Sequence, residues 1–170
     1  MPSPPSTEDA FDKFSAILQA EGLRESMAYL LRLTDYRFIG LWRFRDGRAN
    51  AALHYDREDP SQLYAQEIAD TASYCCYVRD SKGVFMTAHA LLDPATAGHP
   101  AREQVSAYCG IPVMDEFGAI LATLCHYDVV PRDPEQVNIE LMIQVSSALA
   151  RGGLVPPYPS APGNCSSSAD

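Results

Sequence analysis

The feature that most constrains the fold is a pair of apolar segments, residues 106–114 and 119–127, separated by only four residues. The alternating apolar residues around the first segment are Val105, Ala107, Cys109, Ile111 and Val113. This alternation is typical of a strand with one buried face, whereas the second segment is apolar on both faces. The linking sequence Asp-Glu-Phe-Gly predicts a tight turn, because Gly118 can adopt a positive φ. Together the two segments predict a buried β-hairpin.

The composition is that of one acidic globular domain. The chain has 170 residues, enough for a single domain with a substantial core. Its net charge of −9, from 22 acidic and 13 basic residues, argues against nucleic acid or an anionic membrane as a partner, since both attract a basic face. No apolar run reaches about 18 residues, so no membrane span is predicted.

The first residues and the cysteines indicate the compartment. The N-terminal sequence MPSPPSTEDAFDK lacks a basic region followed by an apolar core, so no signal peptide is predicted. The five cysteines, two of them adjacent, do not form the pattern of a disulfide framework in a chain of this length. We therefore expect a reduced, cytoplasmic protein.

Two helices are predicted near the N-terminus. Residues 1–6 are rich in proline and serine and are expected to be disordered. Thr7 is an acceptable N-cap, and the acidic residues after it favour the first turn of a helix. Gly22 ends or kinks this helix, after which apolar spacing predicts a second one. Flanking helices are therefore expected over residues 7–33.

Two strands are predicted next. Residues 36–44 alternate strongly, with aromatic side chains and Gly40 on one face, and a partner strand is expected at residues 49–55. The Asp-Gly pair between them favours a hairpin turn. The aromatic stripe consists of Tyr36, Phe38, Trp42 and Phe44. A stripe of period two is more often core than ligand site, so we assign it to the core.

The middle of the chain predicts less regular structure. A loop is expected over residues 63–70, followed by a short helix that begins near Ser73 and ends near Lys82. A short strand is predicted over residues 84–89. Residues 90–102 contain two prolines and a glycine, so this segment is expected to be an irregular loop or one helical turn.

A helix and a tail complete the chain. Asp133 is a good N-cap and Pro134 suits the first helical position, so a helix is predicted over residues 133–151. Residues 152–170 hold four prolines and a run of serines, and we expect this tail to be disordered. The ordered domain is thus predicted to span residues 7–151.

The order of these elements predicts an α+β fold. Two helices, a hairpin, a short helix, a strand, a loop, the central hairpin and a last helix follow one another along the chain. A mostly antiparallel sheet, with the N- and C-terminal helices packed on one face and a loop-covered pocket on the other, accommodates this order.

The central hairpin resembles the hallmark strands of GAF domains, the small-molecule sensor modules of signalling proteins. The matching residues are Tyr108-Cys109-Gly110-Ile111-Pro112-Val113, Gly118, Ala122-Thr123-Leu124-Cys125-His126-Tyr127-Asp128 and Pro131-Arg132. The resemblance covers roughly residues 23–149 and agrees with the α+β fold. It implies a sensor or regulatory domain that binds a small molecule in signal transduction and reports through a homodimer or a separate signalling protein. It does not name the ligand, so the cofactor is unknown.

The resemblance also implies where a ligand would lie. Residues 73–78 are similar to the family's connecting helix, whose start faces the pocket, and Asp93 with residues 99–103 matches the loop that lies over the cavity. We therefore expect a ligand-binding site there, with no catalytic and no metal-ligating residue assigned. The expected ligand contacts are Tyr74, Cys75, Asp93, His99, Tyr108, Cys109 and Thr123.

Two other interpretations stay open. One is a cysteine-dependent reductase of a small oxidised metabolite, similar to the GAF proteins that reduce free methionine sulfoxide. The matching loop, residues 90–103, has no cysteine, although Cys109 lies near its end. A depressed thiol pKa at Cys75 or Cys109 would favour this activity, because the thiolate is the nucleophile. The other interpretation is a dimerisation module with a vestigial pocket, which predicts a filled cavity.

Further chemistry finds little support in the sequence. The chain has no C-x2-C pair of the kind that binds zinc, and no glycine-rich loop of the kind that binds phosphates. The motifs of photoreceptor and cyclic-nucleotide GAF domains are absent as well. His99 and Arg102 could either bind an anionic ligand or form a local salt bridge, which is worth well under about 1 kcal/mol at a surface.

Overall fold

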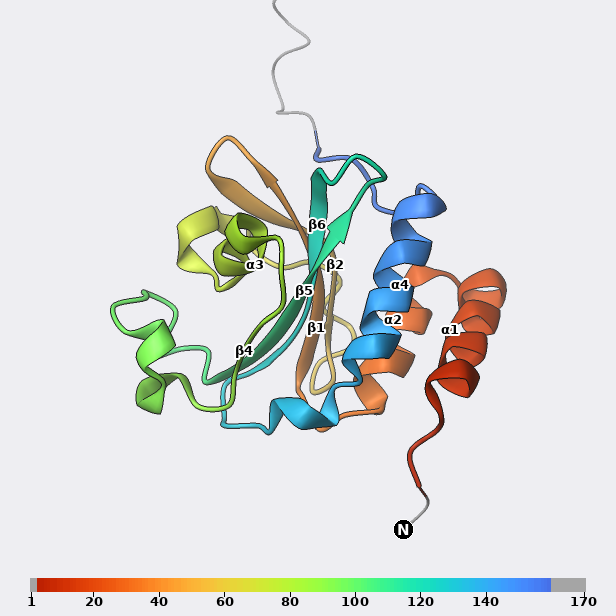
Figure 1. The fold of residues 1–170 in the computed structure, drawn as a ribbon, viewed down its shortest axis with the longest axis horizontal. Helices are drawn as coiled ribbons and strands as arrows, with labels where there is room; N and C mark the ends of the chain where they lie inside the picture. Colours follow the sequence, from red (N-terminus) through yellow and green to blue (C-terminus); the bar gives the residue numbers. More distant parts are fainter. Residues whose placement is uncertain (1–2, 160–170) are drawn as a thin grey trace, which may run out of the picture.

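An antiparallel sheet forms the centre of the molecule. The computed structural model describes residues 3–159, and within them six strands lie in the order β3-β2-β1-β6-β5-β4 (Figure 1). The two hairpins meet where β1 pairs with β6, in the middle of the sheet. The strands are β1 (Phe38–Arg45), β2 (Arg48–Asp56), β3 (Ile68–Ala69), β4 (Phe85–Thr87), β5 (Ala107–Met114) and β6 (Ile120–Asp128).

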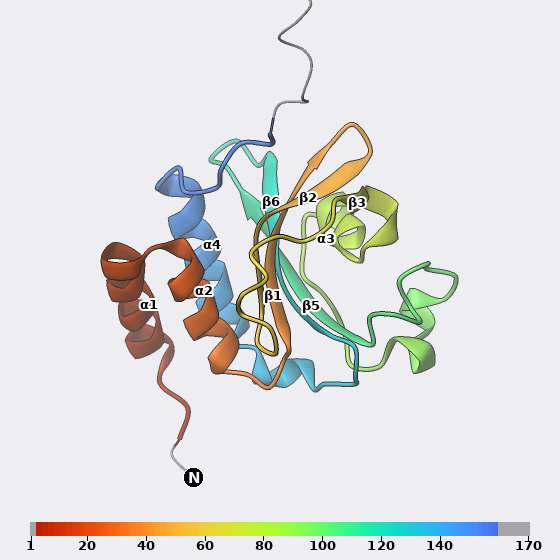
Figure 2. The same cartoon turned by 180° about the vertical axis from the view of Figure 1, so that it is seen from behind.

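Helices cover both faces of the sheet. The helices are α1 (Thr7–Glu21), α2 (Leu23–Arg32), α3 (Cys75–Ser81) and α4 (Ile139–Arg151). On one face α2 and α4 pack on the sheet and α1 packs outside them, whereas α3 lies on the other face beside the irregular segment that precedes β5 (Figures 1 and 2). This arrangement confirms the predicted α+β fold. Within residues 3–159, no helix has both the length and the apolar composition needed to cross a bilayer.

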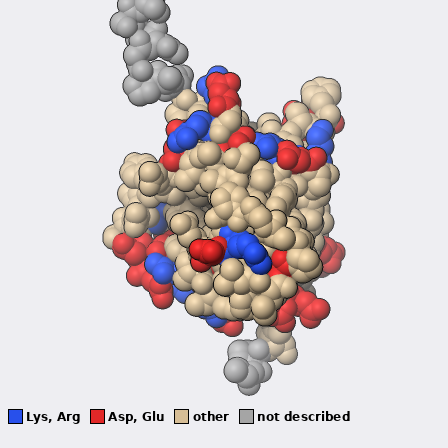
Figure 3. All heavy atoms as spheres, turned by 90° about the vertical axis from the view of Figure 1, so that its left-hand side faces the viewer, with Lys and Arg blue, Asp and Glu red and all other residues tan. Residues whose placement is uncertain are grey.

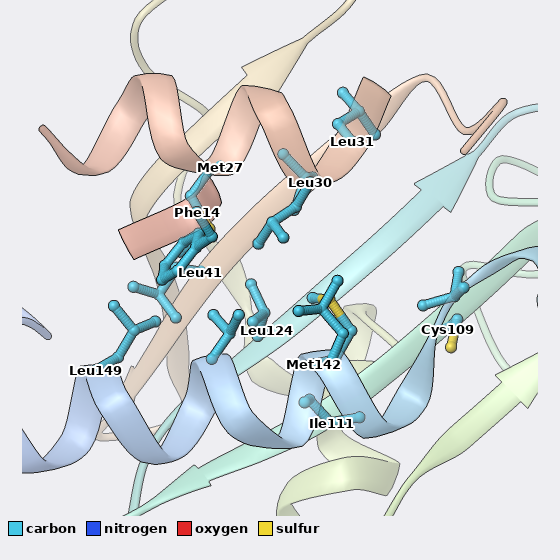
Figure 4. Packing of buried hydrophobic residues seen from close by; sticks show 14 of the residues in the cluster. Phe14, Met27, Leu30, Leu31, Leu41, Cys109, Ile111, Leu124, Met142 and Leu149 are labelled. Carbon is cyan, nitrogen blue, oxygen red and sulfur yellow. The ribbon is translucent and has the colours of Figure 1, made fainter. Parts of the chain in front are cut away.

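The larger core lies between the sheet and the three helices of the first face. Residues of the central hairpin reach it as predicted, because the alternation of β5 turns Cys109 and Ile111 toward α4 (Figure 4). Met142 and Leu149 meet them from α4. Burying a large apolar side chain of this kind stabilises the fold by about 1.5–3 kcal/mol.

Two helix starts differ from the sequence prediction. The Ser6 hydroxyl, not that of Thr7, caps α1 by accepting a hydrogen bond from the Asp9 amide at 3.1 Å. Asp133 caps only a 3₁₀ turn, Pro134–Gln136, because the backbone becomes extended after it. The helix α4 begins later, where the Asn138 side chain accepts from the Leu141 amide. Of the segment 1–6 that we expected to be disordered, residues 1 and 2 lie outside the described part.

The start of the C-terminal tail is docked on the β1–β2 hairpin, which corrects the prediction of disorder from residue 152 onward. Arg43 of β1 donates hydrogen bonds to the carbonyl oxygens of Pro156 and Pro157, at 3.1 and 2.6 Å. The Tyr158 hydroxyl donates to the Glu67 carboxylate. Residues 160–170 of the predicted tail lie outside the described residues.

His126 of β6 is buried in the helix-side core, where its titration opposes folding. Its ring packs edge-on against the ring of Tyr36. Tyr36 lies in this core and not on the predicted aromatic face of the strand, because β1 begins only at Phe38. Burial lowers the pKa of His126 to about 4. The folded state therefore binds its proton less readily than the unfolded state, so stability is lost as pH falls below the ordinary histidine pKa of about 6.5.

We expect His126 alone to remove about 2 kcal/mol of folding stability between pH 7 and pH 5. The measurement is urea unfolding at both pH values for the wild type and for His126→Gln. The variant should lose less stability on acidification than the wild type, even if it is less stable at pH 7. An identical loss in the two proteins would contradict a neutral, buried His126. His54, whose pKa burial also lowers to about 4, supplies a residual pH dependence in both.

Candidate functional site

The start of α3 is held by one local hydrogen bond and by one to the segment that precedes β5. The Ser73 hydroxyl accepts from the Cys75 amide at 3.1 Å, and the Tyr74 hydroxyl donates to the Val105 carbonyl at 3.2 Å. Lys82, in the left-handed region with φ of 52°, ends the helix near the predicted position. As a result, α3 presents Tyr74 and Cys75, both 1% exposed, to the sheet.

Two glycines make room for aromatic rings on the sheet surface under α3. Gly40 of β1 and Gly110 of β5 both pair with Cys125 of β6, so this row of three strands carries a single side chain. A Cβ atom at Gly110 would lie 2.6 Å from Cε1 of Tyr108, and one at Gly40 would lie 2.5 Å from Nε1 of Trp42. Both rings therefore lie flat over glycine and flank the Cys125 sulfur.

A small group of sulfur and hydroxyl atoms lies beneath these rings. The Sγ atoms of Cys75 and Cys125 are 3.9 Å apart, and the Tyr108 hydroxyl donates to Cys75 Sγ at 3.2 Å. Burial alone would raise the pKa of the Cys75 thiol, but the surrounding hydrogen-bonding groups, Cys125 first among them, outweigh it and lower this pKa. Burial raises the pKa of Cys125. Cys75 is therefore the more readily deprotonated thiol of the pair.

A cavity of about 230 Å³ lies above these groups, between the sheet, α3 and residues 101–105. Its aromatic walls are Trp42, Tyr74, Tyr108 and Tyr127. Further lining comes from Ser73 and Gln104, which are polar, from Cys125, and from aliphatic and alanine side chains; among the described residues, no Asp, Glu, Lys or Arg lines it. The face of the molecule in Figure 3 is mostly uncharged, with charged side chains gathered largely toward its edge, apart from acidic and basic groups that lie side by side near its middle. Such a cavity suits an uncharged, flat ligand.

The segment from Asp93 to Gln104 covers one side of this site. The Asp93 carboxylate caps the 3₁₀ turn Pro94–Thr96 by accepting from the Ala95 amide at 2.9 Å. The His99 ring lies 4.6 Å from the Tyr74 ring, centroid to centroid, and its Nδ1 accepts from the Ala101 amide at 3.0 Å. Burial lowers the pKa of His99, which favours the neutral ring. Its role here is to pack the segment against α3.

The structure brings most of the predicted contact residues together. Tyr74 and Tyr108 line the cavity, and Cys75 and His99 lie directly behind them. Thr123 is buried on the same face of β6 as Cys125, and its hydroxyl has no hydrogen-bond partner within residues 3–159.

Two predicted contacts lie elsewhere. Cys109 is on the opposite face of β5 from Tyr108, in the helix-side core, because neighbouring residues of a strand point to opposite faces. Asp93 caps a turn and does not line the cavity. The sequence prediction did not include Cys125 and Trp42 among the ligand contacts, although both line the cavity. The alternation of β6 places Cys125 on the face opposite His126. Within the described residues, no three His, Cys, Asp or Glu side chains are close enough to hold a metal ion.

Comparisons with known proteins identify the architecture. No family model and no curated protein matches the chain. The GAF domain of an Acinetobacter phosphoenolpyruvate-protein phosphotransferase superposes on 88% of this chain and 96% of its own, with a TM-score of 0.64 and 12% identity. The chain has the GAF fold.

Other structures with this fold differ in what they bind. Free methionine-R-sulfoxide reductase from Neisseria meningitidis, in complex with its substrate, covers 85% of this chain and 86% of its own, with a TM-score of 0.66 and 11% identity. A phycoerythrobilin-bound GAF domain from a cyanobacterial phytochrome covers 88% and 95%, with a TM-score of 0.65 and 11% identity. The likeness confirms the predicted fold, and at this level of identity it shows nothing of what the chain binds.

Proposed function

We propose that this chain is a GAF sensor domain that binds a small, uncharged, flat molecule in the cavity beneath α3. The observation that supports it is the cavity of about 230 Å³, which has four aromatic walls and no charged lining residue. Buried charges need partners, so an ionic ligand would find none in this lining. The volume is below the ~300–1,000 Å³ that is usual for drug-sized ligands, which favours a single ring system.

The hydrogen-bonding groups at the cavity suggest how such a ring would be oriented. Ser73 and Gln104 in the lining offer hydrogen-bond donors and acceptors, while the rings of Trp42 and Tyr108 supply apolar surface. A heterocycle with one or two polar atoms at its edge would satisfy both. This chemistry argues against a tetrapyrrole with carboxylates and against a nucleotide, because both carry negative charges.

The signal would leave through the helices on the other face of the sheet. A ligand that contacts Tyr74 and Gln104 touches both the start of α3 and the covering segment, and α3 rests on β5 and β6. The same two strands form the floor of the core under α4. Ligand binding would therefore shift the populations of different α4 arrangements, and a second copy or a separate signalling protein would bind the favoured arrangement. The size of this shift is limited by the difference in the ligand's affinity for the arrangements.

A cysteine-dependent reductase of a small oxidised metabolite is the alternative function. The likeness to the Neisseria enzyme and the lowered pKa of Cys75 favour it. An amino-acid substrate, however, brings an ammonium and a carboxylate group, and the cavity lining offers neither an opposite charge nor a charged hydrogen-bonding partner. The sensor is therefore better supported.

Binding of a fragment library tests the sensor. We expect neutral heteroaromatic fragments to raise the melting temperature and to give heat on titration, whereas charged analogues of equal size should not. In Ala72→Phe the new ring fills the cavity, and binding should be lost. Ala97→Phe is the matched control, because Ala97 is exposed and does not line the cavity. Binding that survives in Ala72→Phe, or equal binding of charged analogues, would contradict the site.

A further inference from the structure

Two buried cysteine thiols meet beside the cavity. Cys75 comes from α3 and Cys125 from β6, and their sulfurs approach to 3.9 Å although the residues are 50 positions apart. Both are free cysteines with at most 1% of their surface exposed. The other two cysteines of the described residues are placed differently: Cys109 faces the helix-side core, and the Cys76 sulfur lies beside His99.

The surroundings of the pair provide what thiol oxidation needs. The Tyr108 hydroxyl donates to Cys75 Sγ, which stabilises negative charge on that sulfur. Cys125 lines the cavity, whereas Cys75 lies one side chain below its wall. A small oxidant in the cavity therefore lies next to the Cys125 sulfur, and Cys75 Sγ is 3.9 Å from that sulfur. A bulkier oxidant has less room to approach either sulfur.

We propose that Cys75 and Cys125 are a redox modification site that a small hydroperoxide converts to a disulfide. The Cys75 thiolate attacks one peroxide oxygen and breaks the O–O bond, which gives a sulfenic acid at Cys75 and releases hydroxide or alkoxide. The Cys125 thiol then displaces the sulfenic hydroxyl group, so that the S–S bond forms and water leaves. The two thiols lose two electrons in total, and the peroxide gains them.

The disulfide would tie the cover of the cavity to its floor. It links α3, which carries Tyr74, to β6 at the row between Gly40 and Gly110. An external dithiol would reverse it by exchange. This site depends on the two sulfurs alone and is independent of whether the cavity also binds a ligand.

Intact-mass measurement on the native protein tests the site. The full chain should carry Cys165→Ser, which removes the one cysteine outside the described residues. After hydrogen peroxide treatment and quenching, we expect a loss of mass equal to two hydrogen atoms and a loss of two titratable thiols, both restored by dithiothreitol. Cumene hydroperoxide, which is much bulkier, should react more slowly at equal concentration.

Single substitutions locate the bond. Cys76→Ser and Cys109→Ala should form the disulfide like the parent, whereas Cys75→Ser and Cys125→Ser should not. In Cys125→Ser the sulfenic acid at Cys75 has no resolving thiol, so dimedone should label it. Cys76→Ser, at the neighbouring position of α3, controls for the folding of the Cys75 variant. An unchanged parent mass, or a disulfide that still forms in Cys75→Ser, would overturn the assignment whatever the result of the ligand screen.

Discussion

Replacing Gly110 by alanine should destabilise the protein by about 1–3 kcal/mol and abolish ligand binding in the cavity. The new Cβ would lie 2.6 Å from Cε1 of Tyr108, whose ring is 2% exposed and cannot turn into solvent without leaving its site. The displaced ring would enter the cavity and withdraw its hydroxyl from Cys75. Urea unfolding measures the first effect, and titration with a fragment that binds the wild type measures the second.

Gly83→Ala is the matched control for this substitution. Gly83 does not have a positive φ, and a Cβ there would lie 3.6 Å from its nearest neighbour, which is an ordinary contact. We expect that variant to keep both stability and binding. If Gly110→Ala bound the fragment like the wild type, Tyr108 would not form the floor of the site.

Ending the chain after Gly153 should cost about 3 kcal/mol of folding stability. The guanidinium of Arg43 is buried, at 8% exposed, and two of its hydrogen bonds go to the carbonyl oxygens of Pro156 and Pro157. Removing these acceptors takes away two charge-assisted hydrogen bonds, each worth about 1.5–3 kcal/mol, and water replaces only part of that contribution. Chemical unfolding of the shortened chain, compared with the full chain, measures the loss.

A double-mutant cycle separates the charge from the rest of the tail. Arg43→Met removes the group that needs the carbonyl acceptors, so truncation should destabilise this variant less than the wild type. The part of the loss that persists comes from contacts such as the packing of Val155 on the core. Equal losses in both backgrounds would show that Arg43 does not depend on residues 154–159.

The central hairpin could be predicted from the sequence because its signals are local. The alternation of residues 106–114, the turn at Gly118 and the apolar run to Tyr127 fix two strands and the face that each side chain takes. The same alternation, applied consistently, would have assigned Cys109 to the helix side and Cys125 to the cavity. The faces on which these two cysteines lie can therefore be predicted from the sequence alone.

The rest of the site depends on register and on distant contacts, which no local pattern contains. That Gly40 and Gly110 face each other across Cys125 follows from the pairing of three strands. The docking of the tail depends on Arg43, more than 100 residues earlier in the chain. At the start of α4, Asp133 and Asn138 are both good caps, and the extended backbone at Val137 decides between them.

The position of Trp42 has an optical consequence. It is the only tryptophan of the chain, and its indole forms one wall of the cavity, over Gly40 and edge-on to the His54 ring. Tryptophan emission from the whole protein therefore originates at this one wall, within the same lining as the Cys125 sulfur. The fluorescence of the unlabelled protein reports directly on the occupancy and the chemical state of the space beneath α3.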